Sequence, residues 1–326
     1  MKKTIRMSKE IIRLFIKKDF QQAKIKLKRL FVGVKFTDGI LYNILVYALL
    51  LSFGYVYLYP ILYMVTNSFM TMEDIIDPGI KWIPSTFNIE NYCLVFVQLN
   101  YFKSLLDAFY LAAFPAISAT VSSAIIGYGF ARYDFPFKKI LFALMLMTFI
   151  VPPQITMLPM FRMFSRYQLL GSIKAFVFPA ILGQGLNGAL FILIFYQFFR
   201  MIPKALDESA QLDGATPFKV FTRIYLPLAI PSIVIVFLFS FVWYYNETYL
   251  SGLYLRGSDL LSLPLKLDQY ISNYTSIYPE GSRARELMQA VKLAGNVMTL
   301  LPLLIIYFFT QKQFVESIDR TGITGE

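Results

Sequence analysis

The sequence predicts an all-α membrane protein, and its composition and the grouping of its apolar residues indicate this class. Of the 326 residues, 57% are hydrophobic and only 16% are charged, against about 45–50% and about 25% in soluble domains. The apolar residues gather in windows long enough to cross a bilayer, which takes about 20 residues. The chain has no histidine and a single cysteine, Cys93. These counts exclude histidine-based catalysis, histidine metal ligands and an internal disulfide.

Six windows are candidate transmembrane helices. The first, Ile40–Val65, is too long for the apolar core of a signal peptide, so we expect it to remain as an anchor. The only ionised residues inside the windows are Asp107 and Glu247, and the shortest window, the last, can extend to Ala290. The other windows are Ser104–Phe130, Ile140–Phe161, Ala175–Phe199, Leu228–Tyr254 and Leu293–Phe309. Prolines in or beside them predict kinked or broken helices, at Pro60, Pro115, Pro152, Pro153, Pro179 and Pro302.

Lysine and arginine residues predict the orientation and the division of the chain. With a cytoplasmic N-terminus, the segments between windows hold 21 of the 31 basic residues inside and 10 outside, so the positive-inside rule places both termini in the cytoplasm. The net charge of +11 therefore reports orientation and predicts no nucleic-acid partner. Residues 1–39 form either a basic amphipathic helix on membrane lipid or an unstructured leader. A six-span domain, 40–312, and a cytoplasmic tail, 313–326, follow.

One loop on the predicted cytoplasmic side, Arg200–Pro227, has an unusual order. Pro203 can open a helix that continues to Leu212, since the first helical turn needs no amide donor. Asp213-Gly214 then signals a turn, and a second helix can begin at Pro217. This second helix places apolar residues on one face, namely Phe218, Phe221 and Ile224 or Tyr225. The predicted helix–turn–helix exposes apolar side chains, which suits docking into a partner's groove.

This loop resembles the EAA loop of ABC-importer permeases. It reads Glu208-Ser209-Ala210, then Gly214 four residues later, then Ile224-Tyr225-Leu226-Pro227, with serine in place of the first alanine of the motif. Residues 40–326 as a whole resemble the carbohydrate, MalG-type permeases, whereas the leader is the least family-like part. The residues that carry this wider resemblance are Tyr59-Pro60, Asn67-Ser68-Phe69, the stretch from Gly127 to Arg132, the stretch from Phe241 to Glu247, the stretch from Gln311 to Val315, and Thr321-Gly322.

The resemblance implies a fold, a function and partners. The fold is a type I ABC-importer permease bundle of six transmembrane helices with a cytoplasmic coupling helix in loop 200–227. The function is ATP-driven import of a sugar or oligosaccharide through a prokaryotic inner membrane. The partners are a second homologous permease, two cytosolic ABC ATPase subunits that bind ATP and Mg, and an extracytoplasmic binding protein. The chain has no GxxxxGK[ST] P-loop, so we expect no cofactor and no enzymatic activity of its own.

The resemblance also assigns roles within the loop. Glu208 and Asp213 are expected to be polar contacts or caps of the coupling helix, Gly214 its turn, and Pro227 the point of re-entry into the membrane. Ala210 and Ala215 are expected on its closely packed face. The ATPase-coupling residues are thus Glu208, Ser209, Ala210, Asp213, Gly214, Ala215, Phe218 and Pro227.

Polar residues inside the spans predict a substrate path, because such groups are costly in lipid. The candidates combine amides and a carboxylate with aromatic rings that suit a sugar: Trp243, Tyr244, Asn246 and Glu247 in the fifth window, and Gln184 and Asn187 among glycines in the fourth. A second interpretation is that the aromatic residues form an interfacial belt and that the amides only join helices.

Two other functions stay open on sequence grounds. The EAA loop identifies coupling to an ATPase and does not identify the transported solute, so an ABC permease for amino acids, phosphate or metal stays an alternative. The aromatic residues of the spans and the C-terminal motif favour a sugar. An ion-coupled secondary carrier commonly shows inverted repeats and ionisable residues near the midplane, and this chain has no clear repeat. The outer segments, Asn67–Lys103 and Leu255–Gln289, either meet a binding protein or cap the bundle.

Overall fold

The computed structural model describes residues 39–80, 82–279 and 281–322, together with isolated positions in the leader. Every regular element in these ranges is a helix, which confirms the all-α class. The chain divides into two compact units, residues 1–66 and 67–326. The helix predicted for the leader, like the last four residues of the predicted tail, lies outside the described residues.

Helix α3 (Ile40–Ser68) forms most of the described part of the first unit. It begins where the first window was predicted and ends three residues beyond it. Its apolar side chains are exposed around the whole helix, as at Leu51 and Tyr57. A helix that is apolar on every face suits a lipid environment.

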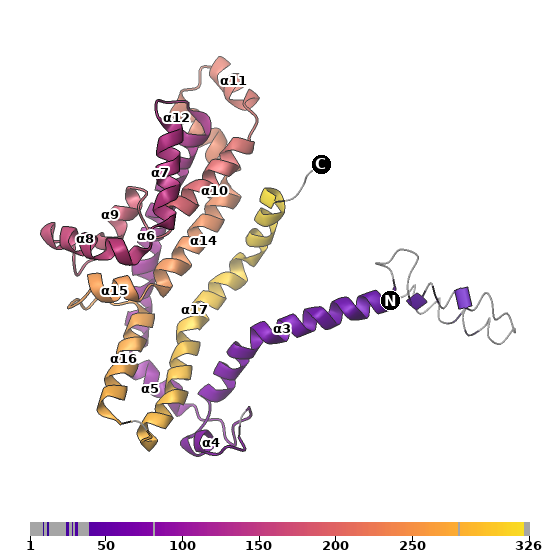
Figure 1. Ribbon diagram of the computed structural model, residues 1–326, viewed down its shortest axis with the longest axis vertical. Coiled ribbons are helices and arrows are strands. Elements are labelled where there is room, and N and C mark those ends of the chain that lie inside the picture. The colour runs from indigo at the N-terminus through magenta and orange to yellow at the C-terminus, as the bar shows by residue number, and fades with distance from the viewer. Residues whose placement is uncertain are drawn as a thin grey trace. The chain divides into compact units, whose positions relative to one another are not determined.

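Three helices form the centre of the second unit: α6 (Tyr101–Arg132), α10 (Gly188–Met201) and α14 (Ile230–Asn246) (Figure 1). Helix α6 packs against both of the others. Buried alanines recur along α6 at four- and three-residue steps, at Ala108, Ala112, Ala116 and Ala119. Small side chains let membrane helices approach closely, and dispersion contacts then stabilise the pairing.

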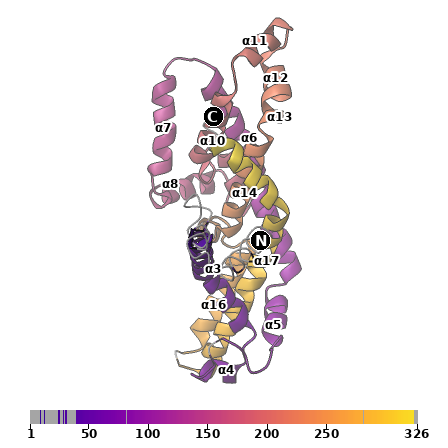
Figure 2. The same cartoon turned by 90° about the vertical axis from the view of Figure 1, so that its right-hand side faces the viewer.

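The third window, Ile140–Phe161, is not one helix. It forms α7 (Lys138–Ile150) and α8 (Pro153–Arg166), which meet at an angle of 99° (Figure 2). The cause is Pro152-Pro153, because neither residue has an amide hydrogen to continue the helical ladder. The break that these prolines predict is therefore present, and α7 and α8 together are apolar enough to form one broken span.

The fourth and fifth windows are also interrupted. Ala175–Phe199 is divided into α9 (Lys174–Ile181) and α10 by a break at residues 182–187. Leu228–Tyr254 is divided into α14 and α15 (Tyr249–Tyr254) at Glu247 and Thr248. In the first break Gly183 and Asn187 both have positive φ angles, of 74° and 54°, a conformation that ends an α-helix.

The last window, Leu293–Phe309, is the middle of a much longer helix, α17 (Arg283–Gly322), which has 40 residues and contains Pro302. Residues 313–322, expected in the tail, continue this helix. In the described residues, three helices are long and apolar enough to span a membrane, and up to six spans result if each bent pair counts as one. The count of six spans stays a prediction.

The outer segments fold as caps on one end of the second unit, opposite to α11 and α12 (Figures 1 and 2). Helices α4 (Met72–Ile76) and α5 (Glu90–Gln98) pack against α17, and α16 (Leu263–Ile277) packs against α6 and α17. Side chains fasten them, as where Lys266 Nζ donates to Ser104 Oγ at 2.9 Å. These segments therefore cover this end of the bundle, and their contact with a binding protein stays a prediction.

Candidate functional site

The predicted helix–turn–helix is present at one end of the second unit. Helix α11 (Ala205–Leu212) is followed by a turn and by α12 (Pro217–Val220). The turn is a Schellman motif, in which the amide of Ala215 donates to Ala210 O at 2.9 Å and the amide of Gly214 donates to Gln211 O at 3.0 Å. Gly214 has φ +74°, and a Cβ at this position would meet no atom within 4 Å. The backbone angle, and not crowding, therefore favours glycine here.

The second predicted helix is not continuous. After α12 the chain forms a π-helical turn, η1 (Phe221–Tyr225), and then α13 (Leu226–Leu228). The amide of Leu226 donates to Phe221 O, one residue further back than the Thr222 O that an α-helix would use, and Pro227 has no amide hydrogen for Arg223 O. Such π-turns are rare and are often found at functional sites.

Helix α11 has little apolar packing, because none of its residues is buried. Ala210 and Ala215 are half-buried against the apolar core, and their role in coupling stays a prediction. Large apolar side chains face outward instead: Leu212 is 89% exposed and Phe218 is 75% exposed. The loop therefore presents apolar surface without a covering element among the described residues.

An aromatic cluster joins this loop to the central helices. Tyr128 of α6 packs on Phe221 and Tyr225 of η1, with ring centroids 4.7 and 4.9 Å apart. Phe199 of α10 lies 5.6 Å from Tyr128 and 5.7 Å from Tyr225. Each aromatic pair contributes about 0.5–1.5 kcal/mol beyond its buried area, so η1 is anchored by apolar packing that α11 lacks.

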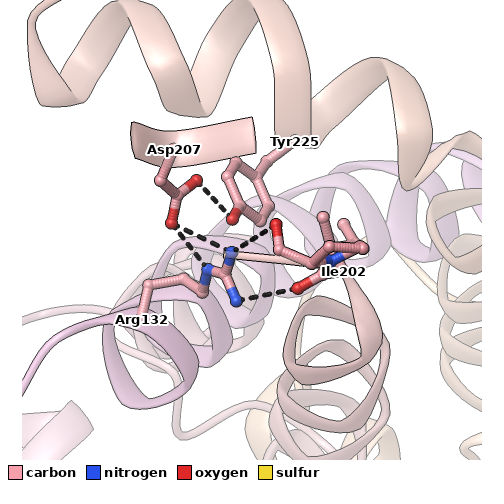
Figure 3. Close-up of polar contacts among 5 residues, drawn as sticks. Arg132, Ile202, Asp207 and Tyr225 are labelled. Carbon is pink, nitrogen blue, oxygen red and sulfur yellow. Dashed lines mark hydrogen bonds and ion pairs between the residues drawn. The ribbon is translucent and has the colours of Figure 1, made fainter. Parts of the chain in front are cut away.

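A polar network centred on Arg132 connects α11 to the end of α6 and to η1 (Figure 3). Arg132, at the end of α6, pairs with Asp207 of α11 through Nε at 3.1 Å and a terminal nitrogen at 2.9 Å. The guanidinium also donates to Ile202 O at 3.0 Å and to Pro203 O at 3.4 Å. Its carbon lies 4.8 Å from the centre of the Tyr225 ring.

Tyr225 completes the network. Its hydroxyl donates to the second carboxylate oxygen of Asp207 at 2.5 Å. Burial and the neighbouring carboxylate raise the pKa of Tyr225, so the phenol keeps its proton and remains a donor at neutral pH. The Arg132 side chain is only 5% exposed and that of Asp207 19%, which shields this pair from solvent far better than an ordinary surface ion pair.

Sequence reasoning missed Asp207 and assigned the polar contacts to its neighbours. Glu208 and Ser209 are exposed, and Glu208 lies in the first turn of α11, where a negative charge favours the helix dipole. Asp213 occupies the C-cap of α11, and Pro227 lies within α13; the coupling roles of Glu208, Asp213 and Pro227 stay predictions. The available signal was an arginine just after one window and an aspartate in the predicted helix on the same side of the membrane.

The predicted substrate-path residues are partly brought together. The amide of Leu186, in the break between Gln184 and Asn187, donates to the hydroxyl of Tyr244 at 3.0 Å. A Cβ on Gly185 would lie 2.6 Å from the same hydroxyl, so this glycine permits the close approach. The side chains of Gln184 and Asn187 are exposed beside this contact.

The other candidates of the path make structural contacts. Trp243 packs on Phe191, with centroids 5.4 Å apart. Asn246 Nδ2 donates to Val242 O at 3.0 Å, and Glu247 Oε1 accepts the amide of Leu250 at 2.7 Å. Asn246 and Glu247 thus bond within their own stretch of chain, and their contact with a substrate stays a prediction.

One known family matches most of the second unit. The model of the binding-protein-dependent transport system inner membrane component matches residues 119–320, from the middle of α6 through the loop to the end of α17. The chain belongs to this family. It is therefore a multi-pass membrane permease component, and the ion-coupled carrier is excluded.

Relatives in this family match nearly the whole chain. The arabinooligosaccharides transport system permease protein AraQ of Halalkalibacterium halodurans is 27% identical over 284 residues, which cover 85% of this chain and 96% of the relative. The polygalacturonan/rhamnogalacturonan transport system permease protein YtcP of Bacillus subtilis is 29% identical over 289 residues, or 87% and 99%.

A solved permease structure shares the fold. It belongs to a bacterial ABC transporter involved in the import of the acidic polysaccharide alginate, and it matches 84% of this chain and 96% of its own with a TM-score of 0.68. The sequence identity is 21%, so this likeness supports the ABC-importer permease fold that the sequence predicts.

Proposed function

We propose that this chain is one of two homologous permease subunits of an ATP-driven importer of oligosaccharides in a prokaryotic cell membrane. Two cytosolic ATPase subunits bind ATP and Mg and hydrolyse the nucleotide, and an extracytoplasmic binding protein delivers the sugar. The observation that carries the coupling role is the loop of α11 and α12, which exposes apolar side chains while its base is tied to α6.

The exposed surface of this loop fits a protein groove. Leu206, Leu212 and Phe218 are each more than two fifths exposed on short helices next to polar residues. Helices that present apolar anchors in this way dock into grooves of partner proteins. Because the chain has no P-loop, the energy for transport has to come from such a partner.

The orientation follows from charge. The positive-inside rule places both termini and the α11 end in the cytoplasm, where the ATPases are. The opposite end, with α4, α5 and α16, then faces the binding protein. Ser209 is exposed, and a thiol placed there by Ser209→Cys, with Cys93→Ser to remove the native exposed cysteine, should react with a membrane-impermeant maleimide only from the cytoplasmic side.

The cargo class is supported by the relatives. AraQ is named for arabinooligosaccharides and YtcP for polygalacturonan and rhamnogalacturonan. A permease of Thermoanaerobacterium thermosulfurigenes, 24% identical, is named as a probable permease for starch degradation products. The rings of Trp243 and Tyr244 suit stacking on sugar faces. An ABC permease for a non-sugar solute is the second candidate.

A screen of the reconstituted complex separates these cargoes. Proteoliposomes that contain both permeases, the ATPases and the binding protein are supplied with arabino-oligosaccharides, oligogalacturonides, malto-oligosaccharides or glutamine. We expect an oligosaccharide to stimulate ATP hydrolysis and to accumulate inside. A complex that omits the binding protein is the control. Stimulation by glutamine alone would contradict the sugar assignment and leave the ABC permease assignment standing.

A further inference from the structure

Arg132 lies where four segments of the second unit meet. It ends α6, its guanidinium binds the carbonyls of Ile202 and Pro203 between α10 and α11, it pairs with Asp207 of α11, and it stacks on Tyr225 of η1. Helices α10 and α11 meet at an angle of 73°. The one side chain therefore contacts both sides of this bend.

The chemistry of this contact requires arginine. A guanidinium is a planar fork of five donors that can bind a carboxylate and carbonyls at once and still stack on a ring. Lysine carries the same charge but offers a single ammonium group and cannot reproduce this arrangement. The 5% exposure of Arg132 means that its donors have little access to water as a substitute.

Helix α11 depends on this network more than the rest of the loop does. It buries none of its residues, whereas η1 is anchored by the buried ring of Tyr225 and by Tyr128 and Phe199. Without the ion pair, α11 would be joined to the second unit mainly by its two chain ends and by the half-buried Ala210.

We propose that Arg132 is a positioning residue that fastens the exposed helix α11 to α6, so that a displacement of α11 by the ATPase moves α6. Helix α6 packs directly on α9, α10 and α14, and a push at its end reaches the break beside Tyr244 through these helices. This inference rests on the proposed function and adds the residue through which the force enters the bundle.

The test compares Arg132→Lys with Arg223→Lys in the full complex. Arg223 lies exposed on the same loop, so the control makes the same chemical change without touching the network. Two quantities are measured: amide hydrogen exchange of residues 205–216, and the number of oligosaccharide molecules imported per ATP hydrolysed, with the sugar that stimulates the wild-type complex most. Asp207→Asn and Tyr225→Phe provide second variants if Arg132→Lys does not insert.

Arg132→Lys and Asp207→Asn should speed the exchange of residues 205–216 about tenfold and lower the import per ATP about tenfold, as for the loss of one or more charge-assisted hydrogen bonds. Arg223→Lys should change neither. Unchanged exchange would overturn the tether. Faster exchange with the wild-type ratio of import to ATP would show that Arg132 only supports the loop and would overturn its role in transmission.

The same experiment separates this inference from the proposed function. A wild-type complex that hydrolyses ATP but imports no oligosaccharide contradicts the proposed function. The exchange of residues 205–216 then still decides whether Arg132 holds α11, because it is measured without any substrate.

Discussion

Gly127 provides a sensitive test of how closely α6 and α10 are packed. A Cβ on Gly127 would lie 2.7 Å from Phe195 Cβ, 3.0 Å from Ile192 O and 3.0 Å from Tyr196 N. All of these atoms belong to the backbone of α10 or to the first carbon of a side chain, so no rotamer change can remove the clash. Gly127→Ala must therefore push the two helices apart.

Gly129 offers a matched control two residues along the same helix, because a Cβ there meets no atom within 4 Å. Both changes gain up to about 1 kcal/mol of helix propensity. Overpacking a well-packed interior costs about 1–3 kcal/mol, and only Gly127→Ala incurs this cost. We therefore expect Gly127→Ala to be less stable than Gly129→Ala by about 1–3 kcal/mol.

Thermal unfolding of the purified chain in detergent, followed by intrinsic fluorescence, measures this difference. At about 1.5 °C per kcal/mol, from about 2.1 cal/mol/K per residue over 326 residues, Gly127→Ala should melt about 1.5–4.5 °C below Gly129→Ala. Separation of α6 from α10 should also move Arg132 away from Ile202 O, so import should fall in the same variant. Equal melting temperatures, or a more stable Gly127→Ala, would refute the close contact.

Three further changes test the loop and the broken span. Phe218→Ala should leave the melting temperature unchanged, since exposed substitutions change stability by about 0.5 kcal/mol or less. The same change should weaken ATPase binding about tenfold in a pull-down titration. Full binding would show that Phe218 is not an anchor. Gly214→Val should destabilise the turn by about 1–2 kcal/mol and reduce uptake. Gly214→Asn should retain uptake, because asparagine tolerates a positive φ. Equal uptake by the two variants would contradict the Schellman turn. Tyr244→Phe removes the acceptor for Leu186 N and should cost about 1–3 kcal/mol in thermal unfolding, against no loss for the exposed Tyr249→Phe.

The helical windows were predictable because lipid imposes long apolar runs on the sequence. The bend at Pro152-Pro153 was predictable in kind, since proline ends the hydrogen-bond ladder. The break at residues 182–187 was predictable only as one of two alternatives, because its glycines permit either a local break or a close helix approach. The contact that accompanies the break is tertiary: the amide of Leu186 donates to Tyr244, a residue 58 positions later.

The loop was predictable where its structure depends on local residues. Pro203, Asp213-Gly214 and Pro217 are local signals, and the helix–turn–helix follows them closely. The π-turn leaves no clear pattern in the sequence. Asp207 was missed because its partners, Arg132 and Tyr225, lie 75 and 18 positions away, and only the packing of α6 against the loop brings them together.

The length of α17 has a consequence for the reach of the C-terminal part of the chain. Its 40 residues make a rod of about 60 Å at about 1.5 Å per residue, twice the roughly 30 Å of a hydrocarbon core. The apolar part ends at Lys312, and the helix continues for about 15 Å more, to Gly322. In a flexible tail the distances between residues vary, whereas in a helix they are fixed along its axis. The family-like residues Gln311 and Thr321 both lie on this helix and are thereby kept about 15 Å apart along its axis.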